Sequence, residues 1–237
     1  MLWIKMADLM IEIHNHYDYV EKMCADYRVE EGKKADMVIE VTEEAILKEQ
    51  QDASISCSLE YCESICIYRE ISKKLIHYQG FLMHGACIEV EGEVYVFCAK
   101  SGTGKSTHLA LWKKHFGEKT RIINGDKPII RWFPGREKEF VVYGTPWCGK
   151  EGWNINTSGD MKAICFLERG EKNQIHPISG EEAIKRLGHQ ILMPKAPHEM
   201  ISYLDMIDVL LKTTPCYLLS CNMEEEAAVV AYQGMNH

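Results

Sequence analysis

The segment from Ala99 to Thr107 carries the residue types of a phosphate-binding loop, Ala-Lys-Ser-Gly-Thr-Gly-Lys-Ser-Thr. Glycines let successive backbone N–H groups turn toward phosphate oxygens, a lysine reaches the outer phosphates, and a neighbouring hydroxyl ligates Mg²⁺. Lys105 and Ser106 are the candidates for the last two roles, and Ala99 replaces the usual first glycine without removing a phosphate-binding group. The residues predicted to bind phosphate are Ser101, Gly102, Thr103, Gly104, Lys105, Ser106 and Thr107.

A carboxylate follows the next short apolar strand, which is predicted over residues 119–124. Asp126 comes directly after this strand and precedes Lys127-Pro128. A carboxylate at the end of a strand beside a phosphate loop faces the terminal phosphate, where Mg²⁺ or a general base must sit. We therefore predict that Asp126 is a metal ligand or a base; an ordinary turn aspartate is the alternative.

A third unusual stretch covers residues 144–156, which contain three glycines, two tryptophans and no periodicity. Such a loop is costly in backbone entropy unless it has a function. The ammonium group of Lys150 and the amides of Asn154 and Asn156 suit binding of a phosphate or of the substrate. The alternative is a loop that merely fills the core.

Composition narrows the class of protein. With 237 residues and 46% hydrophobic content, the chain can form one large domain or two small ones. A net charge of −8 argues against nucleic-acid binding, and no apolar run approaches the roughly 18 residues of a membrane span. We therefore expect a cytoplasmic protein that binds neither nucleic acid nor a membrane.

Metal binding by cysteine or histidine is not indicated. The ten cysteines include no Cys-x-x-Cys pair and lie partly in apolar runs, so they are interpreted as reduced core thiols rather than zinc ligands. His14 and His16 would share one face of a strand, but no third ligand is evident. A solvated position is the better interpretation of this pair.

The elements that must position these residues alternate between strands and helices. Before residue 35 the only signal is a weak strand pattern over residues 11–19. Apolar patterning and turn residues predict strands over residues 35–41, 87–90, 94–98, 119–124, 129–132, 140–143, 161–167, 175–178 and 216–221. Helical spacing and caps predict helices over residues 42–47, 59–79, 106–116, 179–192 and 198–212, and a closing helix capped by Asn222. The phosphate loop thus follows a β-hairpin and opens a helix, the setting that its chemistry requires.

With these motifs, the chain resembles the family of HPr kinase/phosphorylase and ATP-dependent phosphoenolpyruvate carboxykinase, particularly its small bacterial HPr-kinase-like members. The matching segments are residues 81–86, 101–107, 123–127 and 144–156, within residues 60–235. The resemblance implies an α/β fold leaning to α+β, with a mixed, β-rich P-loop core and flanking helices. Residues 59–237 would form the nucleotide-binding domain, and residues 1–58 a β-rich segment packed on the core or part of it.

The resemblance also implies roles for single residues. His84 matches a histidine that lies near the transferred phosphate in the kinases, although a lone histidine in an apolar run can equally be a core residue. Asp126 occupies the position of the base within a paired aspartate, but the preceding residue here is Gly125. The second Mg²⁺ ligand would then come from elsewhere or be water.

The predicted function is an ATP- and Mg²⁺-dependent kinase that phosphorylates a hydroxyl. The acceptor could be a serine of a protein or precursor peptide, or a small metabolite. The alternative is a nucleotide-binding regulatory module with little or no phosphoryl transfer, which the missing second carboxylate favours. A carboxykinase is less favoured, because such enzymes are much larger and no dicarboxylate-binding segments are evident. The oligomeric state stays open, a homo-oligomer included.

Overall fold

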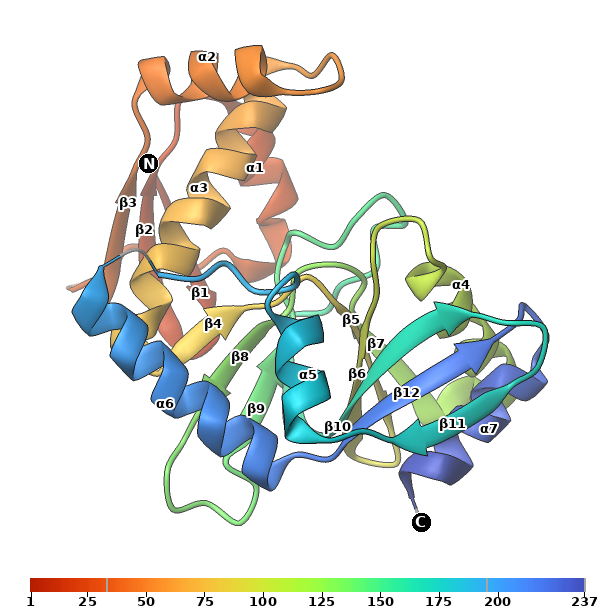
Figure 1. Ribbon diagram of the computed structural model, residues 1–237. Coiled ribbons are helices and arrows are strands. Elements are labelled where there is room, and N and C mark those ends of the chain that lie inside the picture. Colours follow the sequence, from red (N-terminus) through yellow and green to blue (C-terminus); the bar gives the residue numbers. More distant parts are fainter. Residues whose placement is uncertain (33, 195, 237) are drawn as a thin grey trace. The chain divides into compact units, whose positions relative to one another are not determined.

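The computed structural model describes residues 1–32, 34–194 and 196–236. Contacts within the chain divide it into two compact units, Met1–Tyr78 and Gln79–His237, and Figure 1 labels the elements of each. No helix in the described residues combines the length and the apolar character that a membrane crossing demands.

The N-terminal unit combines a small sheet with helices. Its strands and helices are β1 (Leu2–Met6), β2 (Leu9–His14), α1 (Asp18–Met23), η1 (Ala25–Tyr27), β3 (Met37–Glu40), α2 (Glu43–Asp52), α3 (Leu59–Leu75) and η2 (Ile76–Tyr78). Strand β2 lies in the middle of the sheet, antiparallel to β1 and parallel to β3. The hydroxyl of Thr42 caps α2 by accepting a hydrogen bond from the Ala45 amide at 3.2 Å.

Two expectations for this unit differ from the structure. Residues 2–14 form two full strands around a tight turn at Ala7 and Asp8, both with positive φ, whereas residues 17–19 lie outside the sheet. Helix α3 contacts α1, α2 and β3. The division therefore falls after Tyr78 instead of between residues 58 and 59.

The C-terminal unit is mixed α/β. Its elements are β4 (Gly80–Leu82), β5 (Ala86–Val90), β6 (Glu93–Cys98), α4 (Lys105–Phe116), η3 (Gly117–Lys119), β7 (Thr120–Asn124), β8 (Ile129–Trp132), β9 (Phe140–Tyr143), β10 (Ser158–Arg169), β11 (Gln174–Pro177), α5 (Gly180–Leu187), α6 (Pro197–Thr213), β12 (Cys216–Cys221) and α7 (Glu226–Met235). In the described residues, its nine strands form one sheet with the main order β4-β8-β9-β10-β6-β5-β7, and β12 and β11 branch from β10. The hairpins β5–β6 and β8–β9 are present as predicted.

Strand β10 organises this sheet. Its first residues pair with β9 in antiparallel fashion, and its later residues pair in parallel with both β6 and β12. Strand β7 also runs in the direction of β6, because each is antiparallel to β5. The carboxyl ends of β6, β7, β10 and β12 therefore meet at one edge of the sheet, where α/β proteins place their ligand sites.

Helices cover both faces of the parallel part of the sheet. Helices α4 and α7 contact each other and one face, where Trp112 is fully buried with its ring centroid 5.1 Å from Tyr95 and 5.3 Å from Phe97. Alternate residues of β10 point to the other face, where Arg186 of α5 lies over the Phe166 ring at 5.9 Å. The core around Trp112 thus fixes α4 and the loop that precedes it.

Several element boundaries differ from the prediction, and three of them lie near the sheet edge described above. Strand β10 continues to Arg169, where a turn was expected. Helix α5 ends at Leu187, because the carbonyl of Gln190 accepts a hydrogen bond from the His84 amide at 2.6 Å and Ile191 pairs with Met83. Helix α7 begins at Glu226, and Asn222 caps only the preceding turn through the Glu224 amide.

Candidate nucleotide site

The loop between β6 and α4 contains two glycines with positive φ and leads directly into a helix. Gly102 and Gly104 have φ values of 77° and 124°, which residues with a Cβ atom rarely adopt. Lys105 begins α4, so the free amides and the positive dipole end of this twelve-residue helix face the loop. Positive-φ glycines and a helix N-terminus therefore meet at this loop, and phosphate binding by residues 101–107 stays a prediction.

The side chain of Lys105 points back into the protein. It is 9% exposed, and its Nζ lies 3.2 Å from the Ala99 carbonyl oxygen and 3.1 Å from His84 Nε2. Burial lowers the pKa of Lys105, and the negative charge of Asp126 offsets this only in part. A phosphate bound at the loop would place a second negative charge near this ammonium group and favour its protonated form.

His84 joins Lys105 to Asp126. It precedes β5, which begins at the same sheet edge, and its Nε2 lies 3.2 Å from Asp126 Oδ1. The backbone fixes this arrangement, since the Gly85 amide donates to the Asp126 carbonyl at 3.0 Å. The structure thus brings together three predicted site residues from three different segments: Lys105, His84 and Asp126.

Asp126 is partly buried and strongly stabilised as a carboxylate. Burial raises its pKa, but the hydrogen bond from His84 and the charge and hydrogen bond of Lys127 outweigh that effect and hold the pKa at about 2. Lys127 Nζ lies 2.8 Å from Asp126 Oδ2. Asp126 is therefore ionised at neutral pH.

Asn124 holds the turn that carries Asp126. It is fully buried, and its Oδ1 accepts hydrogen bonds from the amides of Asp126 at 2.9 Å and Lys127 at 2.7 Å. Its Nδ2 donates to the Thr145 carbonyl at 2.9 Å, and the Thr145 hydroxyl donates to the Lys127 carbonyl at 2.7 Å. This network ties the strand end to the loop of residues 144–156.

Gly125 explains why a single carboxylate stands at this strand end. A Cβ atom added to Gly125 would lie 2.6 Å from the Cys148 carbonyl oxygen. A Cβ atom added to Gly149 would lie 3.3 Å from the Cβ atom of Asp126, so the loop is close to this turn on a second side. The 144–156 loop thus packs directly over the position that a second aspartate would need.

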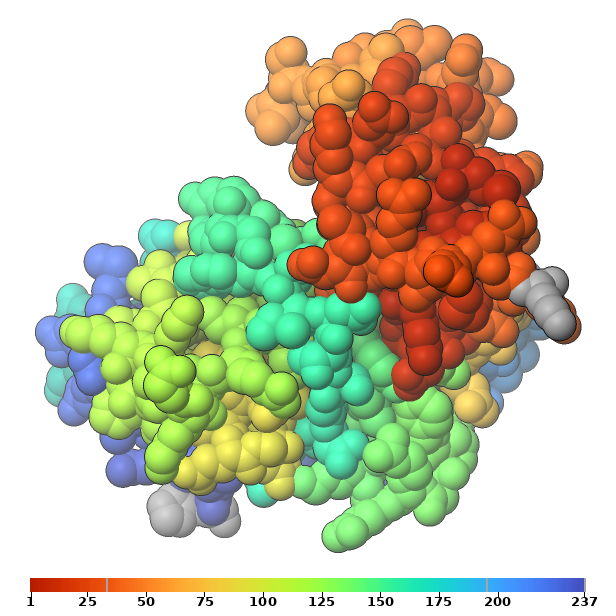
Figure 2. Space-filling view, turned by 180° about the vertical axis from the view of Figure 1, so that it is seen from behind, coloured from red at the N-terminus to blue at the C-terminus, as the bar shows by residue number. Residues whose placement is uncertain are grey.

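The three loop residues predicted to bind substrate have different surroundings. Asn154 Nδ2 donates to the Thr145 carbonyl at 3.1 Å and therefore belongs to the Asn124 network. The Lys150 side chain is 91% exposed, 3.9 Å from Glu151, and Asn156 is exposed. Figure 2 shows part of this loop as a blue-green projection from the surface of the C-terminal unit.

The donor set for a metal is small. Within residues 1–32, 34–194 and 196–236, no group of three or more histidine, cysteine, aspartate or glutamate side chains could hold a metal ion. His14 instead contacts Glu12 at 2.6 Å and Glu40 at 2.8 Å. At the nucleotide site the available donors are the Ser106 hydroxyl and the Asp126 carboxylate, so most ligands of a Mg²⁺ ion would come from phosphate and water.

Sequence reasoning missed two basic residues of this edge. Lys127 follows Asp126 in the sequence and forms its ion pair. Arg169, at the carboxyl end of β10, donates from Nη2 to the Gly102 carbonyl at 2.5 Å and from Nε to the Thr103 carbonyl at 3.3 Å. Only the parallel pairing of β10 with β6 could have revealed Arg169, and that pairing is not local in sequence.

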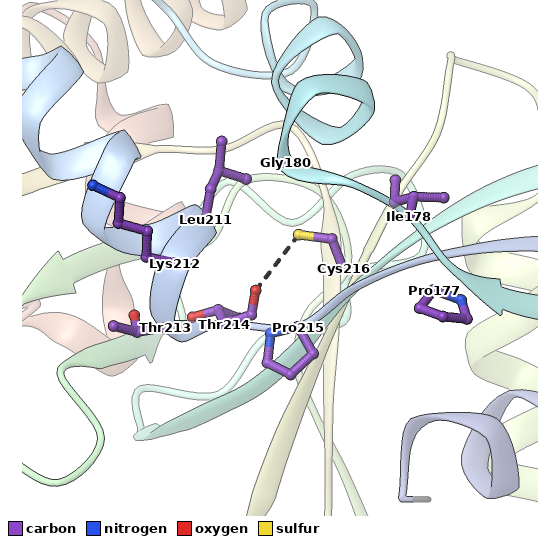
Figure 3. A pocket seen from close by; sticks show the side chains of 9 residues that line it. All are labelled: Pro177, Ile178, Gly180, Leu211, Lys212, Thr213, Thr214, Pro215 and Cys216. Carbon is purple, nitrogen blue, oxygen red and sulfur yellow. Dashed lines mark hydrogen bonds between the residues drawn. The ribbon is translucent and has the colours of Figure 1, made fainter.

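Two pockets lie near opposite ends of β12. The larger, of 510 Å³, borders the phosphate loop. The smaller, of 240 Å³, lies where β12 begins, and Figure 3 shows Cys216 there donating its S–H to the Thr214 carbonyl. The charged group at the smaller pocket, Lys212, pairs with Asp208 at 2.6 Å. The larger pocket alone continues the candidate site.

The chain is similar to one protein family and to distant solved structures. A family model described as "SynChlorMet cassette protein ScmC" matches residues 47–226. The search of curated proteins gave no match. Among solved structures, the HPr(Ser) kinase/phosphatase from Coxiella burnetii is 8% identical, with a TM-score of 0.36 over 66% of this chain and 95% of that chain. At this identity and TM-score the likeness carries no information on activity.

Proposed function

This chain belongs to the family of the SynChlorMet cassette protein ScmC, and we propose that it is an ATP-dependent phosphotransferase acting on a hydroxyl group. The family description states no reaction, so the site must carry the proposal. The supporting observation is that His84 Nε2 lies 3.1 Å from Lys105 Nζ and 3.2 Å from Asp126 Oδ1. A carboxylate is thereby held next to the lysine that would face the transferred phosphate.

The loop of residues 101–107 and Lys105 bind the phosphates. The amides of residues 102–105 cradle the β-phosphate, and Lys105 neutralises charge that develops on the γ-phosphate. Arg169 holds the carbonyls of Gly102 and Thr103, which keeps the loop amides directed toward the ligand. Positioning and charge neutralisation supply most of the rate enhancement in such transfers.

Asp126 orients the acceptor. Because its pKa is held at about 2, it is a weak base and its first role is to accept a hydrogen bond from the attacking hydroxyl. In a loose transition state the hydroxyl proton leaves late, when the oxygen has become acidic enough for this carboxylate to take it. Ser106 and Asp126 would hold Mg²⁺ bound to the nucleotide, and the ion would supply charge neutralisation at the phosphates.

The acceptor is a hydroxyl of a protein, a precursor peptide or a small metabolite. The exposed Lys150 can reach an anionic group on such an acceptor or the outgoing phosphate. Asn154 and Asn156 belong to the same loop, and because the Asn154 amide is bonded to the Thr145 carbonyl, its part in acceptor binding would be to fix the shape of this loop. All ten cysteines lie in the described part of the chain and are free, which fits a reducing compartment such as the cytoplasm.

The test is acceptor-dependent release of ADP from Mg·ATP by the purified chain, with a panel of serine-containing peptides and hydroxylated metabolites. Lys105→Ala and Asp126→Asn should abolish the release. Lys113→Ala removes an exposed lysine from α4, outside the loop, and should leave the release within about twofold, as expected for a surface substitution. Tight ATP binding without acceptor-dependent ADP release across the panel would overturn the kinase.

One observation favours a second candidate, a nucleotide-binding regulatory module. Both oxygens of Asp126 already have partners in His84 and Lys127, and packing at Gly125 leaves no room for a second carboxylate. A carboxylate whose two oxygens are both engaged is poorly placed to activate a hydroxyl, whereas the loop amides and Lys105 would still bind a nucleotide. ATP binding that changes the protein's conformation, with no phosphorylated product, would favour this candidate.

A further inference from the structure

Two cysteines of the N-terminal unit are in direct contact. The Sγ atom of Cys57 lies 3.1 Å from the Sγ atom of Cys62, and both residues are free thiols. A disulfide bond is about 2.05 Å long, so the two sulfur atoms need to approach by only about 1 Å to become bonded. The pair lies outside the candidate nucleotide site, which belongs to the C-terminal unit.

The start of α3 explains why these two side chains meet. Ser58 is the N-cap of this helix, and its hydroxyl accepts a hydrogen bond from the Tyr61 amide at 3.2 Å. Cys57 therefore precedes the cap, and Cys62 is the fourth residue of the helix. Side chains at these two positions pack against each other at many helix starts. The contact is thus a consequence of the capped first turn, and a disulfide bond would close a short ring across that turn.

Helix α2 holds Cys57 at this position. Nε2 of Gln50 donates a hydrogen bond to the Cys57 carbonyl at 2.8 Å. Further along the two helices, Arg69 of α3 forms an ion pair with Glu49 of α2. These contacts fix the connection between α2 and α3, which Figure 1 shows as a loop between the two helices. The two sulfur atoms are therefore brought together before any bond forms, and such positioning accelerates a reaction between them.

The two cysteines differ in their access to solvent. Cys62 is fully buried, and burial raises the pKa of its thiol to about 12. Cys57 is only half-buried, and its neighbours Ser56 and Ser58 are exposed. A dissolved oxidant therefore reaches Cys57 first, whereas Cys62 can react only with a group that is already attached to Cys57. Redox-sensing cysteines are commonly arranged in this way, with an accessible thiol beside a resolving one.

We propose that Cys57 and Cys62 form a reversible disulfide bond when the protein meets a small disulfide such as oxidised glutathione. The Cys57 thiolate attacks one sulfur atom of the small disulfide, forms a mixed disulfide and releases one small thiolate. Cys62 then gives up its proton and attacks the Cys57 Sγ atom, which releases the second small thiolate. The two cysteines together lose two electrons, the small disulfide gains them, and the two thiol protons end on the released thiolates.

The bond would tie the first turn of α3 to the connection from α2. Fraying of this turn moves Cys57 away from Cys62, and a covalent bond between them prevents that movement. In a reducing compartment such a bond is transient and forms in response to oxidation. The inference goes beyond the proposed function and does not require a bound nucleotide.

The test exposes the native chain to glutathione buffers with a rising oxidised fraction, blocks the remaining thiols with N-ethylmaleimide and analyses the peptides by mass spectrometry. We expect a peptide in which Cys57 and Cys62 are joined, with two hydrogen atoms fewer than the reduced peptide, and its return to the reduced form with dithiothreitol. In Cys62→Ser, Cys57 should retain the small thiol as a lasting mixed disulfide. Cys66→Ser is the matched control, because the Cys66 S–H is directed to the Ala45 carbonyl at 3.7 Å, and it should leave the Cys57–Cys62 bond unchanged.

Hydrogen exchange on the native chain measures the structural effect without any variant. Oxidation should slow the exchange of the amides in residues 57–62 at least about threefold. Three results would overturn the proposal: a mixed disulfide that persists on Cys57 of the native chain, a bond between Cys57 and Cys66, or thiols that stay reduced in oxidised glutathione. Unchanged exchange in the oxidised chain would overturn the tie at the start of α3. The outcome is separate from the kinase test, since ADP release is not part of either measurement.

Discussion

Nε2 of His84 lies 3.2 Å from Oδ1 of Asp126. The same nitrogen lies 3.1 Å from Lys105 Nζ, and one ring nitrogen either donates or accepts. With its proton on Nδ1 the ring accepts from Lys105, and with a proton on Nε2 it donates to Asp126. A phosphate that draws Lys105 Nζ away from His84 therefore frees the Nε2 position to donate a hydrogen bond to Asp126. In this way nucleotide binding is coupled to the hydrogen bonding of the Asp126 carboxylate.

This coupling predicts that His84→Ala separates binding from turnover. ATP affinity should stay within about threefold, because loop amides and Lys105 hold the phosphates, while acceptor-dependent ADP release should fall at least about tenfold. Equilibrium binding and initial rates measure the two quantities. Lys105→Ala is the matched comparison, since it should lose ATP binding itself. Equal losses of affinity in both variants would remove His84 from the transfer step.

Acid should destabilise the protein through Asp126. Its folded pKa of about 2 lies below the ordinary value, so the unfolded chain takes up the proton first as the pH falls. The stabilisation is complete above about pH 5 and is lost as the pH falls toward 2. Urea unfolding in the presence of a chelator should show a steeper loss of stability between pH 5 and 3 in the native chain than in Asp126→Asn. Parallel curves would contradict the pKa shift.

Gly125→Ala should be destabilising by about 1 to 3 kcal/mol, because the new Cβ would lie 2.6 Å from the Cys148 carbonyl oxygen. Gly180→Ala is the control, since the nearest atom to its Cβ would be Leu211 Cβ at 3.9 Å. Thermal or urea unfolding measures both changes. If Gly125→Ala were as stable as the control, packing would not explain the single carboxylate.

Asn124→Ala should cost about 2 to 4 kcal/mol of stability and most of the transfer activity. The substitution removes the acceptor of the Asp126 and Lys127 amides and the donor to Thr145, all within a fully buried site. Asn173→Ala, which breaks side-chain bonds to Glu226 and Asn222 near the surface, should cost less. Stability that is retained without Asn124 would show that the turn is held by other contacts.

Local sequence patterns predicted the parts of the fold that depend on local interactions. The β5–β6 hairpin, the glycine loop and α4 follow from alternation, turn residues and helical spacing within short segments. Helix α5 ended earlier than predicted, since His84 and Met83 pair with Gln190 and Ile191 and hold them extended. Such pairing between distant segments overrides the apolar spacing that the sequence offers.

The residues of the candidate site also separate into those predicted from local motifs and those that depend on contacts between distant segments. Lys105 and Asp126 were predicted from their motifs, and His84 from a resemblance, and the structure brings the three together. Arg169 could not be predicted, because its role depends on which strands lie beside β6. The role of Lys150 stays a prediction, with its side chain in solvent.

The position of β10 has a consequence for the order in which the chain folds. Strand β6 ends at Cys98 and its parallel partner β10 begins only at Ser158, so their pairing closes a long loop, and loop closure of this kind slows folding. The hairpins β5–β6 and β8–β9 need no such closure and can form first. Arg169 reaches Gly102 only after β10 has docked, so we expect refolding chains to regain hairpin structure before they regain the capacity to bind a nucleotide.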